Sequence, residues 1–525
     1  MKFFCSFLLF SFYASIAMSQ IQSIHFLDTT FGKGGRFSYH FNSGDLYFHN
    51  TVVARQLDGK IIAGSRIRMP SGIVAQGLVQ CLEDGTVDSS FANNGEWFTD
   101  DPWFSNNNKL MVQPDGKIVL AGRSGNEATL LRLLSDGSYD ITFGNNGKIK
   151  HAVFGLPNSI AMDDIGMLSD GKLIFAASYG PKEIAIVCLN ADGSLCPEFG
   201  TMSKVFFPRE ELGYQSIGSG GIAVTEDNKI LVTGSVASLV NYWEAGFIRR
   251  YDSTGKIDST FGQNGTTMFE AKLVVAGDIL LFPDGGFIIP TKVATNLGDK
   301  LAHVKFNANG TIDTNYGVNG YAIYNENSAI KAAFLQPDEK VIVTTYLPAS
   351  GVDSEKHTAI RFNQNGAQDV TFGNNGEIYC TKYIGGDSNY VGLNFSTGFA
   401  LSNEKFIVSG RAFWGDTLVI ARYMTGQSVG VVDIPSTIQS ALLYPNPVYT
   451  PSVTLEYELT ENSQIDIDLI NAEGKWMASL LSEPRTSGNN KEEILLPAGL
   501  SPGFYYLNIR NNRGNTFVKL VVISA

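Results

Sequence analysis

Five carboxylates fall in irregular stretches between apolar segments and could take part in acid–base chemistry. A pair of Asp or Glu residues flanking a glycosidic bond can exchange the protons that hydrolysis requires. Such a pair would indicate a carbohydrate-active enzyme. Nothing in their spacing brings them together, however, and exposed acids are usually only solvated. The residues are Asp100, Asp101, Glu210, Glu211 and Asp387.

Large aromatic side chains occur in the same kind of stretch. Trp and Tyr rings present flat apolar faces that suit sugar and peptide surfaces, and loops on a regular scaffold often carry binding residues. An equally weighted alternative is that these rings fill space at the bases of loops. The predicted ligand-contacting residues are Trp97, Trp103, Tyr242, Trp243, Tyr383, Tyr390 and Trp414.

Metal and cofactor chemistry has little support in the sequence. None of the six histidines lies two to five residues from another histidine or from a cysteine pair, as a local metal motif would require. The chain has no G-x-S-x-G and no phosphate-loop motif, so no nucleophile elbow or nucleotide site is predicted. We therefore predict no metal and no cofactor.

Four of the five cysteines lie beyond the N-terminal apolar stretch. Cys188 and Cys196 could close a short loop through a disulfide. Buried free thiols are favoured, because four cysteines in a chain of 525 residues are not a disulfide framework. The four residues are Cys81, Cys188, Cys196 and Cys380.

Two sequence blocks alternate along the chain and define a repeat. One approximates D-x-T-F-G-x-x-G, and the other is Q-P-D-G-K followed by apolar residues. Asp-Gly supplies the positive backbone angle of a tight turn, and the apolar run after it is typical of a strand. Each repeat predicts four strands, which form one blade of a β-propeller. The central aromatics are Phe31, Phe91, Phe143, Phe199, Phe261, Tyr316 and Phe372.

The repeat is divided between the two ends of its array. The first block, at 28–35, lacks the three strands that precede the block in every other unit. The last unit, at 395–424, has these three strands but no block after them. A linear β-solenoid has no reason to split a unit, but a ring does, because joining the pieces removes its last edge. The strand 37–41 is expected to complete blade seven. The predicted fold class is an all-β, seven-bladed propeller over 20–426, closed by an N-terminal strand.

This pattern resembles the delta-60 repeat family, bacterial repeats of the form Q-P-D-G-K-I-V-x-A-G followed by D-x-T-F-G. The resemblance covers about 24–426 and implies a repeat fold without an established chemistry. Three departures stand out. Pro290 would end a strand of blade five, Glu339 replaces a turn glycine, and the run from Cys196 to Glu198 replaces the acidic start of a block.

The N-terminus is typical of a secretory signal peptide, predicted over 1–19. Lys2 precedes a mostly apolar run, and Ala17 and Ser19 form a small-x-small cleavage site. The apolar run is too short to favour a membrane anchor, and no later segment is predicted to span a bilayer. Beyond a predicted linker at 427–440, alternating apolar and polar residues in 441–525 predict a small Ig-like β-sandwich.

The C-terminal stretch carries a set of marker residues at its start, before its last hairpin and in its final strand: Tyr444, Pro445, Asn446, Pro447, Gly503, Tyr505 and Lys519. With these residues it is similar to the type A sorting domain of the type IX secretion system of Bacteroidetes. The similarity implies export through the periplasm, the secretion machinery as a partner, and a product on the outer-membrane surface or released. An ordinary Ig-like accessory domain is the alternative.

The net charge of −12 argues against nucleic acid as a partner, because binding to phosphates requires clustered Lys and Arg. The function predicted from the sequence is a secreted or cell-surface binding protein that presents variable aromatic loops to a glycan or protein. A secreted carbohydrate-active enzyme and a purely structural surface protein remain the alternatives.

Overall fold

The computed structural model describes residues 26–523, except for 43–44, 100–103, 125–126, 151–160, 239–244, 272, 275–278, 296–297, 325–328, 348–355, 381–392, 413–416, 427–437, 449, 472–475 and 512–513. The predicted signal peptide lies outside these residues. Within them the only helix is the 3-10 helix η1 (Arg209–Leu212), and no helix has the length and apolar character of a membrane span. The chain divides into two compact units, Met1–Gln427 and Ser428–Ala525.

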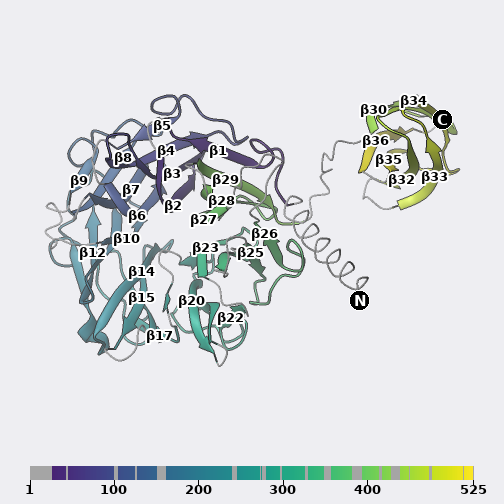
Figure 1. Cartoon of the computed structure of the whole chain (residues 1–525). Coiled ribbons are helices and arrows are strands. Elements are labelled where there is room, and N and C mark those ends of the chain that lie inside the picture. The colour runs from purple at the N-terminus through teal and green to yellow at the C-terminus, as the bar shows by residue number, and fades with distance from the viewer. Residues whose placement is uncertain are drawn as a thin grey trace, which may run out of the picture. The chain divides into compact units, whose positions relative to one another are not determined.

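The first unit contains seven sheets that surround a common centre (Figure 1). We number them as blades in chain order. Blade 1 contains β2 (Asp45–Arg55), β3 (Ile61–Arg68), β4 (Val74–Cys81) and β5 (Glu96–Phe98). Blade 2 contains β6 (Phe104–Val112), β7 (Ile118–Ser124), β8 (Glu127–Leu133) and β9 (Lys148–Lys150). Blade 3 contains β10 (Ala161–Met167), β11 (Leu173–Tyr179), β12 (Glu183–Leu189) and β13 (Lys204–Pro208). Blade 4 contains β14 (Ser216–Val224), β15 (Ile230–Ala237), β16 (Ala245–Tyr251) and β17 (Thr266–Phe269).

The remaining blades complete the ring. Blade 5 contains β18 (Leu273–Val274), β19 (Leu280–Leu281), β20 (Phe287–Thr295), β21 (Gly298–Phe306) and β22 (Tyr321–Tyr324). Blade 6 contains β23 (Ala329–Leu335), β24 (Val341–Leu347), β25 (Lys356–Phe362) and β26 (Glu377–Tyr379). Blade 7 contains β27 (Leu393–Ala400), β28 (Lys405–Ala412), β29 (Thr417–Met424) and β1 (Arg36–His40).

The predicted ring closure is confirmed. Strand β1 pairs antiparallel with β29, with Phe37 opposite Ile420. Just before it, the Asp28 amide donates to the Arg422 carbonyl at 2.9 Å. Because β1 supplies the outer strand that β29 lacks, the two ends of the repeat array form one sheet (Figure 1).

The connections on one face of the ring have constant lengths. Strand three reaches strand four through 82–95, 134–147, 190–203, 252–265, 307–320 and 363–376, which are equal in length. The Q-P-D-G-K turns between strands one and two lie on the same face. Connections on the opposite face differ: β7 ends at Ser124 and β8 begins at Glu127, whereas β26 ends at Tyr379 and β27 begins at Leu393. We call these the constant face and the variable face.

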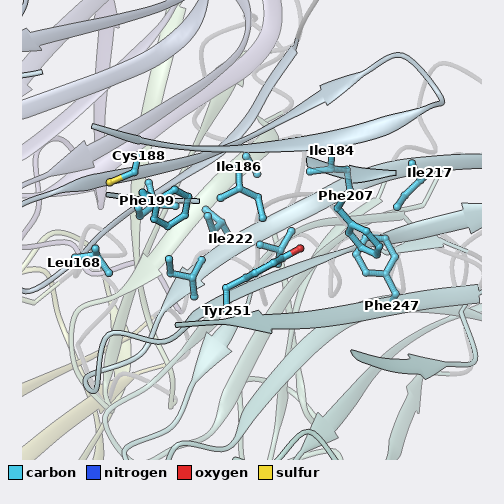
Figure 2. Packing of buried hydrophobic residues seen from close by; sticks show 14 of the residues in the cluster. Leu168, Ile184, Ile186, Cys188, Phe199, Phe207, Ile217, Ile222, Phe247 and Tyr251 are labelled. Atoms are coloured by element: carbon cyan, nitrogen blue, oxygen red, sulfur yellow. The ribbon is translucent and has the colours of Figure 1, made fainter. Parts of the chain in front are cut away.

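Neighbouring blades are joined through the D-x-T-F-G block. The residue after each block aromatic donates its amide to a carbonyl in the next blade, as from Gly144 to Asp192 at 2.8 Å and from Gly317 to Asn365 at 2.8 Å. The aromatics themselves are buried between blades. The hydrophobic core therefore lies between adjacent sheets, as in the cluster between blades 3 and 4 (Figure 2). Figure 2 labels Leu168, Ile184, Ile186, Cys188, Phe199, Phe207, Ile217, Ile222, Phe247 and Tyr251.

Pro290 does not end its strand, which corrects the expectation from the sequence. β20 continues to Thr295, and Pro290 pairs with His303 of β21. On the other side of β20, the inner strand is interrupted: Leu280 pairs with Ile288 and Leu273 with Lys292, while no described pair faces Pro290. Proline has no amide hydrogen to donate, so the strand tolerates it where the inner partner is broken.

The second unit is a β-sandwich of two antiparallel sheets. One sheet has the order β30-β31-β34 and the other β33-β32-β35-β36. β30 begins at Ile438, inside the predicted linker, because Ile438 pairs with Leu459 of β31. The strands are β30 (Ile438–Tyr444), β31 (Ser452–Leu459), β32 (Ser463–Asn471), β33 (Trp476–Arg485), β34 (Gly488–Leu495), β35 (Gly503–Asn511) and β36 (Gly514–Val522).

Candidate functional site

Trp97 belongs to the core, which corrects its assignment as a ligand contact. It lies in β5 and exposes only 6% of its surface. Its ring packs edge-on against the Tyr139 ring, with 5.8 Å between the ring centres. A side chain so buried cannot present its face to a ligand. The other six predicted aromatics, Trp103, Tyr242, Trp243, Tyr383, Tyr390 and Trp414, lie outside the described residues.

The two described acids of the predicted catalytic set are held in ion pairs. Glu210 and Glu211 lie in η1. Glu211 pairs with Arg249 at 2.5 Å, and the Arg249 guanidinium lies 3.6 Å from the centre of the Phe207 ring. Glu210 pairs with the neighbouring Arg209 at 2.9 Å. The pair between Glu211 and Arg249 anchors η1 to blade 4. The remaining acids, Asp100, Asp101 and Asp387, lie outside the described residues.

Two other acids, which the sequence analysis did not single out, have raised pKa values on the inner strand β10. Burial raises the pKa of Asp163 and of Asp164. Asp163 accepts hydrogen bonds from the Ser178 and Ser219 hydroxyls at 2.6 and 2.5 Å. Asp164 accepts the Ile222 amide at 3.0 Å. These contacts join blade 3 to blade 4, so the pair has a structural role; its signal in the sequence was two adjacent acids in an otherwise apolar strand.

The aspartate of each D-x-T-F-G block is the centre of a repeated network that we call the ring clamp. In blade 2, Oδ1 of Asp140 accepts the amide and hydroxyl of Thr142 at 3.1 and 2.6 Å. Its Oδ2 accepts Nε of Arg132, from strand three, at 2.8 Å. Lys117, the lysine of the Q-P-D-G-K block, lies 3.6 Å away. The block aspartate therefore caps its local turn, and the structure adds two cations to it.

The ring clamp controls the ionisation of its aspartates. Burial opposes the charge on Asp369, but hydrogen bonds from Lys340 and Thr371 and the charge on Arg361 lower its pKa to about 2. The pKa of Asp28 is likewise about 2, because hydrogen bonds from Lys405 and Thr30 and the charge on Arg422 outweigh burial. These aspartates are permanently charged at neutral pH and are unsuited to proton transfer.

A cavity of about 610 Å³ opens on the constant face among the Q-P-D-G-K turns of blades 4, 5 and 6. Glu226, Asp284 and Glu339 contribute acids to its lining, and Arg250 contributes a cation. Arg250 is already bound to Asp258 at 3.0 Å and to the Ala308 carbonyl at 2.6 Å. The cavity thus arises where repeated turns meet. Among the described residues, no group of three His, Cys, Asp or Glu side chains could hold a metal ion.

The start of the second unit is tied to its last strand. The Asn446 amide group donates to the Lys519 carbonyl at 2.7 Å, and its oxygen accepts the Val521 amide at 2.8 Å. Next to it, Lys491 donates to the Tyr444 hydroxyl at 2.8 Å. The structure therefore brings Tyr444, Asn446 and Lys519 to one end of the sandwich, although they are far apart in sequence. Pro445 follows Tyr444 and Pro447 follows Asn446, and both of these peptide bonds are cis.

An exposed row of side chains crosses the four-stranded sheet of this unit, and we call it the outer row. Ile470 of β32 faces Trp476 on one side and Tyr506 on the other, and Tyr506 faces Lys519. Trp476 is 59% exposed, and Lys519 lies 4.1 Å from the centre of the exposed Phe504 ring. Tyr505 points inward, and its hydroxyl donates to the Ser501 carbonyl at 2.9 Å. Gly503 is the first residue of β35, the strand that carries Tyr505 and Tyr506.

Two family models match the chain. The secretion system C-terminal sorting domain matches residues 442–523. The β-propeller domain of unknown function DUF5122 matches 56–91, 113–143, 168–199 and 225–261. The chain carries DUF5122 propeller repeats and a secretion sorting domain. The sorting domain coincides with the sandwich, and the propeller matches fall in blades 1 to 4, so the predicted families are confirmed.

No curated protein matches the chain. Among solved structures it is similar to the β-propeller domain of the trilobed protease from Pyrococcus furiosus, at 10% identity and a TM-score of 0.37, covering 73% of this chain and 94% of that one. It is also similar to the acylaminoacyl peptidase from Pyrococcus horikoshii, at 10% identity and a TM-score of 0.40, covering 80% of this chain and 59% of that one.

Proposed function

We propose that the protein is exported through the type IX secretion system and that its propeller binds a glycan or protein partner with the variable face. The export half rests on the sorting-domain match over 442–523. The outer row, with its aromatic rings beside Lys519, is the part of this domain that we assign to recognition by the export machinery.

The binding half rests on the contrast between the two faces. The constant face repeats connections of equal length, and its polar groups are committed to turns and to the ring clamp. The variable face has connections of different length between similar strands. A rigid scaffold with one divergent set of loops is the usual arrangement of a binding surface. The candidate contacts are the six aromatics that fall between these strands: Trp103, Tyr242, Trp243, Tyr383, Tyr390 and Trp414.

The test measures binding of the mature full chain to a glycan array and to envelope proteins of a bacterium with a type IX system. Trp243→Ala and Trp414→Ala should each weaken binding by roughly five- to 150-fold, since truncating an aromatic anchor of an interface costs on the order of 1–3 kcal/mol. Trp476→Ala, in the sorting domain, is the matched control and should leave binding unchanged.

Equal losses in all three variants would contradict the binding face. Turnover of a polysaccharide without stable binding would favour the enzyme instead. In the same bacterium, the tagged chain should reach the surface, and a chain lacking 442–523 should remain in the periplasm.

A further inference from the structure

Each ring clamp contains a pair of facing positions, which are 8 residues apart in blades such as 2 and 6 but come from opposite ends of the repeat array in blade 7. One is on strand three and the other is the block aspartate, whose amide donates to the strand residue's carbonyl, as from Asp140 to Arg132 at 3.0 Å. The side chains at these positions meet directly, with Arg361 and Asp369 at 2.9 Å and Arg422 and Asp28 at 2.8 Å.

In blade 3 both positions are cysteines. Cys188 occupies the strand position and Cys196 the block position, and the Cys196 amide donates to the Cys188 carbonyl at 3.4 Å. Both side chains are buried, at 0% and 1% exposure, in the core between blades 3 and 4. Each thiol lies close enough to the other to affect its pKa. The blade therefore has a thiol pair at the positions where blades 2, 4, 5, 6 and 7 have an ion pair; in blade 1 the same positions are Gln80 and Asp88.

The backbone already holds the two cysteines at a suitable separation. Leu189 and Leu195 form an antiparallel bridge just inside the pair, and the turn is closed by the Gly193 amide donating to the Asn190 carbonyl at 2.8 Å. The pair shares one backbone hydrogen bond, because the Cys188 amide donates to the Ser203 carbonyl at 3.0 Å. Facing residues of antiparallel strands have Cα atoms about 4.5–5.5 Å apart. This lies within the range of about 4.4–6.8 Å that disulfides span.

The lysine next to the cysteine pair has no block aspartate to bind, because Cys196 occupies that position. Lys172 is the Q-P-D-G-K lysine of blade 3, and in place of a block aspartate it pairs with Asp170 at 2.6 Å and Glu198 at 3.5 Å. Burial raises the pKa of both thiols, and the charge on Lys172 partly opposes this effect. Burial dominates in the folded blade, so the reactive thiolate form is accessible only before the pair is covered.

We propose that Cys188 and Cys196 are oxidised to a disulfide that replaces the ion pair of the ring clamp in blade 3. One cysteine thiolate attacks a sulfur of a disulfide oxidant, which forms a mixed disulfide and releases one half of the oxidant. The second cysteine thiolate attacks the protein sulfur of the mixed disulfide and releases the other half. The S–S bond forms, and the two electrons and two protons of the cysteine thiols pass to the oxidant, which leaves as two thiols. The bond forms during folding, before blade 4 covers the pair. In the cell it depends on the proposed export, because the periplasm is oxidising.

The direct test is independent of export. The full mature chain is refolded with oxidised glutathione, unfolded in iodoacetamide and analysed as peptides by mass spectrometry. We expect Cys81 and Cys380 to be alkylated, and Cys188 and Cys196 to appear in one cross-linked species lighter by two hydrogen atoms. The species should be absent from Cys196→Ser. Alkylation of all four cysteines, or a cross-link to Cys81 or Cys380, would overturn the proposal.

A second measurement separates a cross-link from mere proximity. The double variant C188R/C196D installs the residue pair of the other clamps. Adding reductant to the oxidised wild-type chain should lower its unfolding midpoint by a few degrees, in line with a short-loop disulfide in a chain of this size. The double variant should not respond. An equal response in both proteins, or none in the wild type, would contradict a disulfide in the clamp.

Discussion

At the scale of single residues, similar aspartates have different tasks because their surroundings differ. Asp136 and Asp140 each accept a local amide and hydroxyl two residues onward. Only Asp140 is buried and bonded to Arg132. The local contacts follow from turn chemistry, whereas the ion pair requires strand three to run alongside the block.

Replacing Asp140 by Asn should destabilise the propeller strongly. The variant keeps an oxygen for Thr142 but leaves the buried Arg132 guanidinium without a counter-charge, which costs about 3–5 kcal/mol. Asp136→Asn is the matched control and should change the free energy of unfolding by no more than about 0.5 kcal/mol. Chemical denaturation at pH 7 measures both. Similar losses in the two variants would mean that turn capping, not the ion pair, stabilises the blade.

At the scale of elements, the connections on the constant face depend on glycines at particular positions. Gly116 and Gly310 both have positive φ, at 83° and 84°. A Cβ on Gly116 would approach only Ser135, at 3.6 Å, but a Cβ on Gly310 would lie 2.6 Å from the Phe261 ring of the preceding blade. The first glycine is required by its turn alone, and the second also by the contact between blades.

The two glycines therefore provide a matched pair of substitutions. Gly116→Ala should cost about 1–2 kcal/mol from backbone strain alone. Gly310→Ala should cost about 1–3 kcal/mol more, because the added methyl group overpacks the contact between blades 4 and 5. Thermal unfolding of both variants measures the difference. Equal midpoints would indicate that the blades separate slightly at no cost.

At the scale of the whole molecule, the ring depends on the segment that contains β1. Phe37 is buried in the core that joins blade 7 to blade 1. The Arg422 guanidinium bonds to Asp28 of the same segment at 2.8 Å and to the Glu83 carbonyl of blade 1 at 2.8 Å. Removal of this segment would leave β29 with an open edge.

A chain that begins after residue 41 should therefore be sensitive to proteolysis in blade 7 and prone to self-association through that edge. Adding a peptide of residues 26–41 should restore protection. The same peptide carrying Phe37→Asp should not, because the charge would be buried. Limited proteolysis and size-exclusion chromatography follow the two states. A truncated chain as protected as the full one would contradict closure by β1.

The sequence alone determined the repeat, its four strands per unit and the closure of the ring, because turn residues and apolar alternation are local and recur in phase. It also identified the C-terminal domain, through residues that mark its ends. Tertiary structure decided what depends on contacts between distant segments. Trp97 is a core residue because blade 2 covers it, and Pro290 is tolerated where neither β18 nor β19 pairs with it. The cations of the ring clamp converge because strands two and three of a blade both lie next to its block. The same packing brings Cys188 and Cys196 face to face, which spacing in the sequence left open.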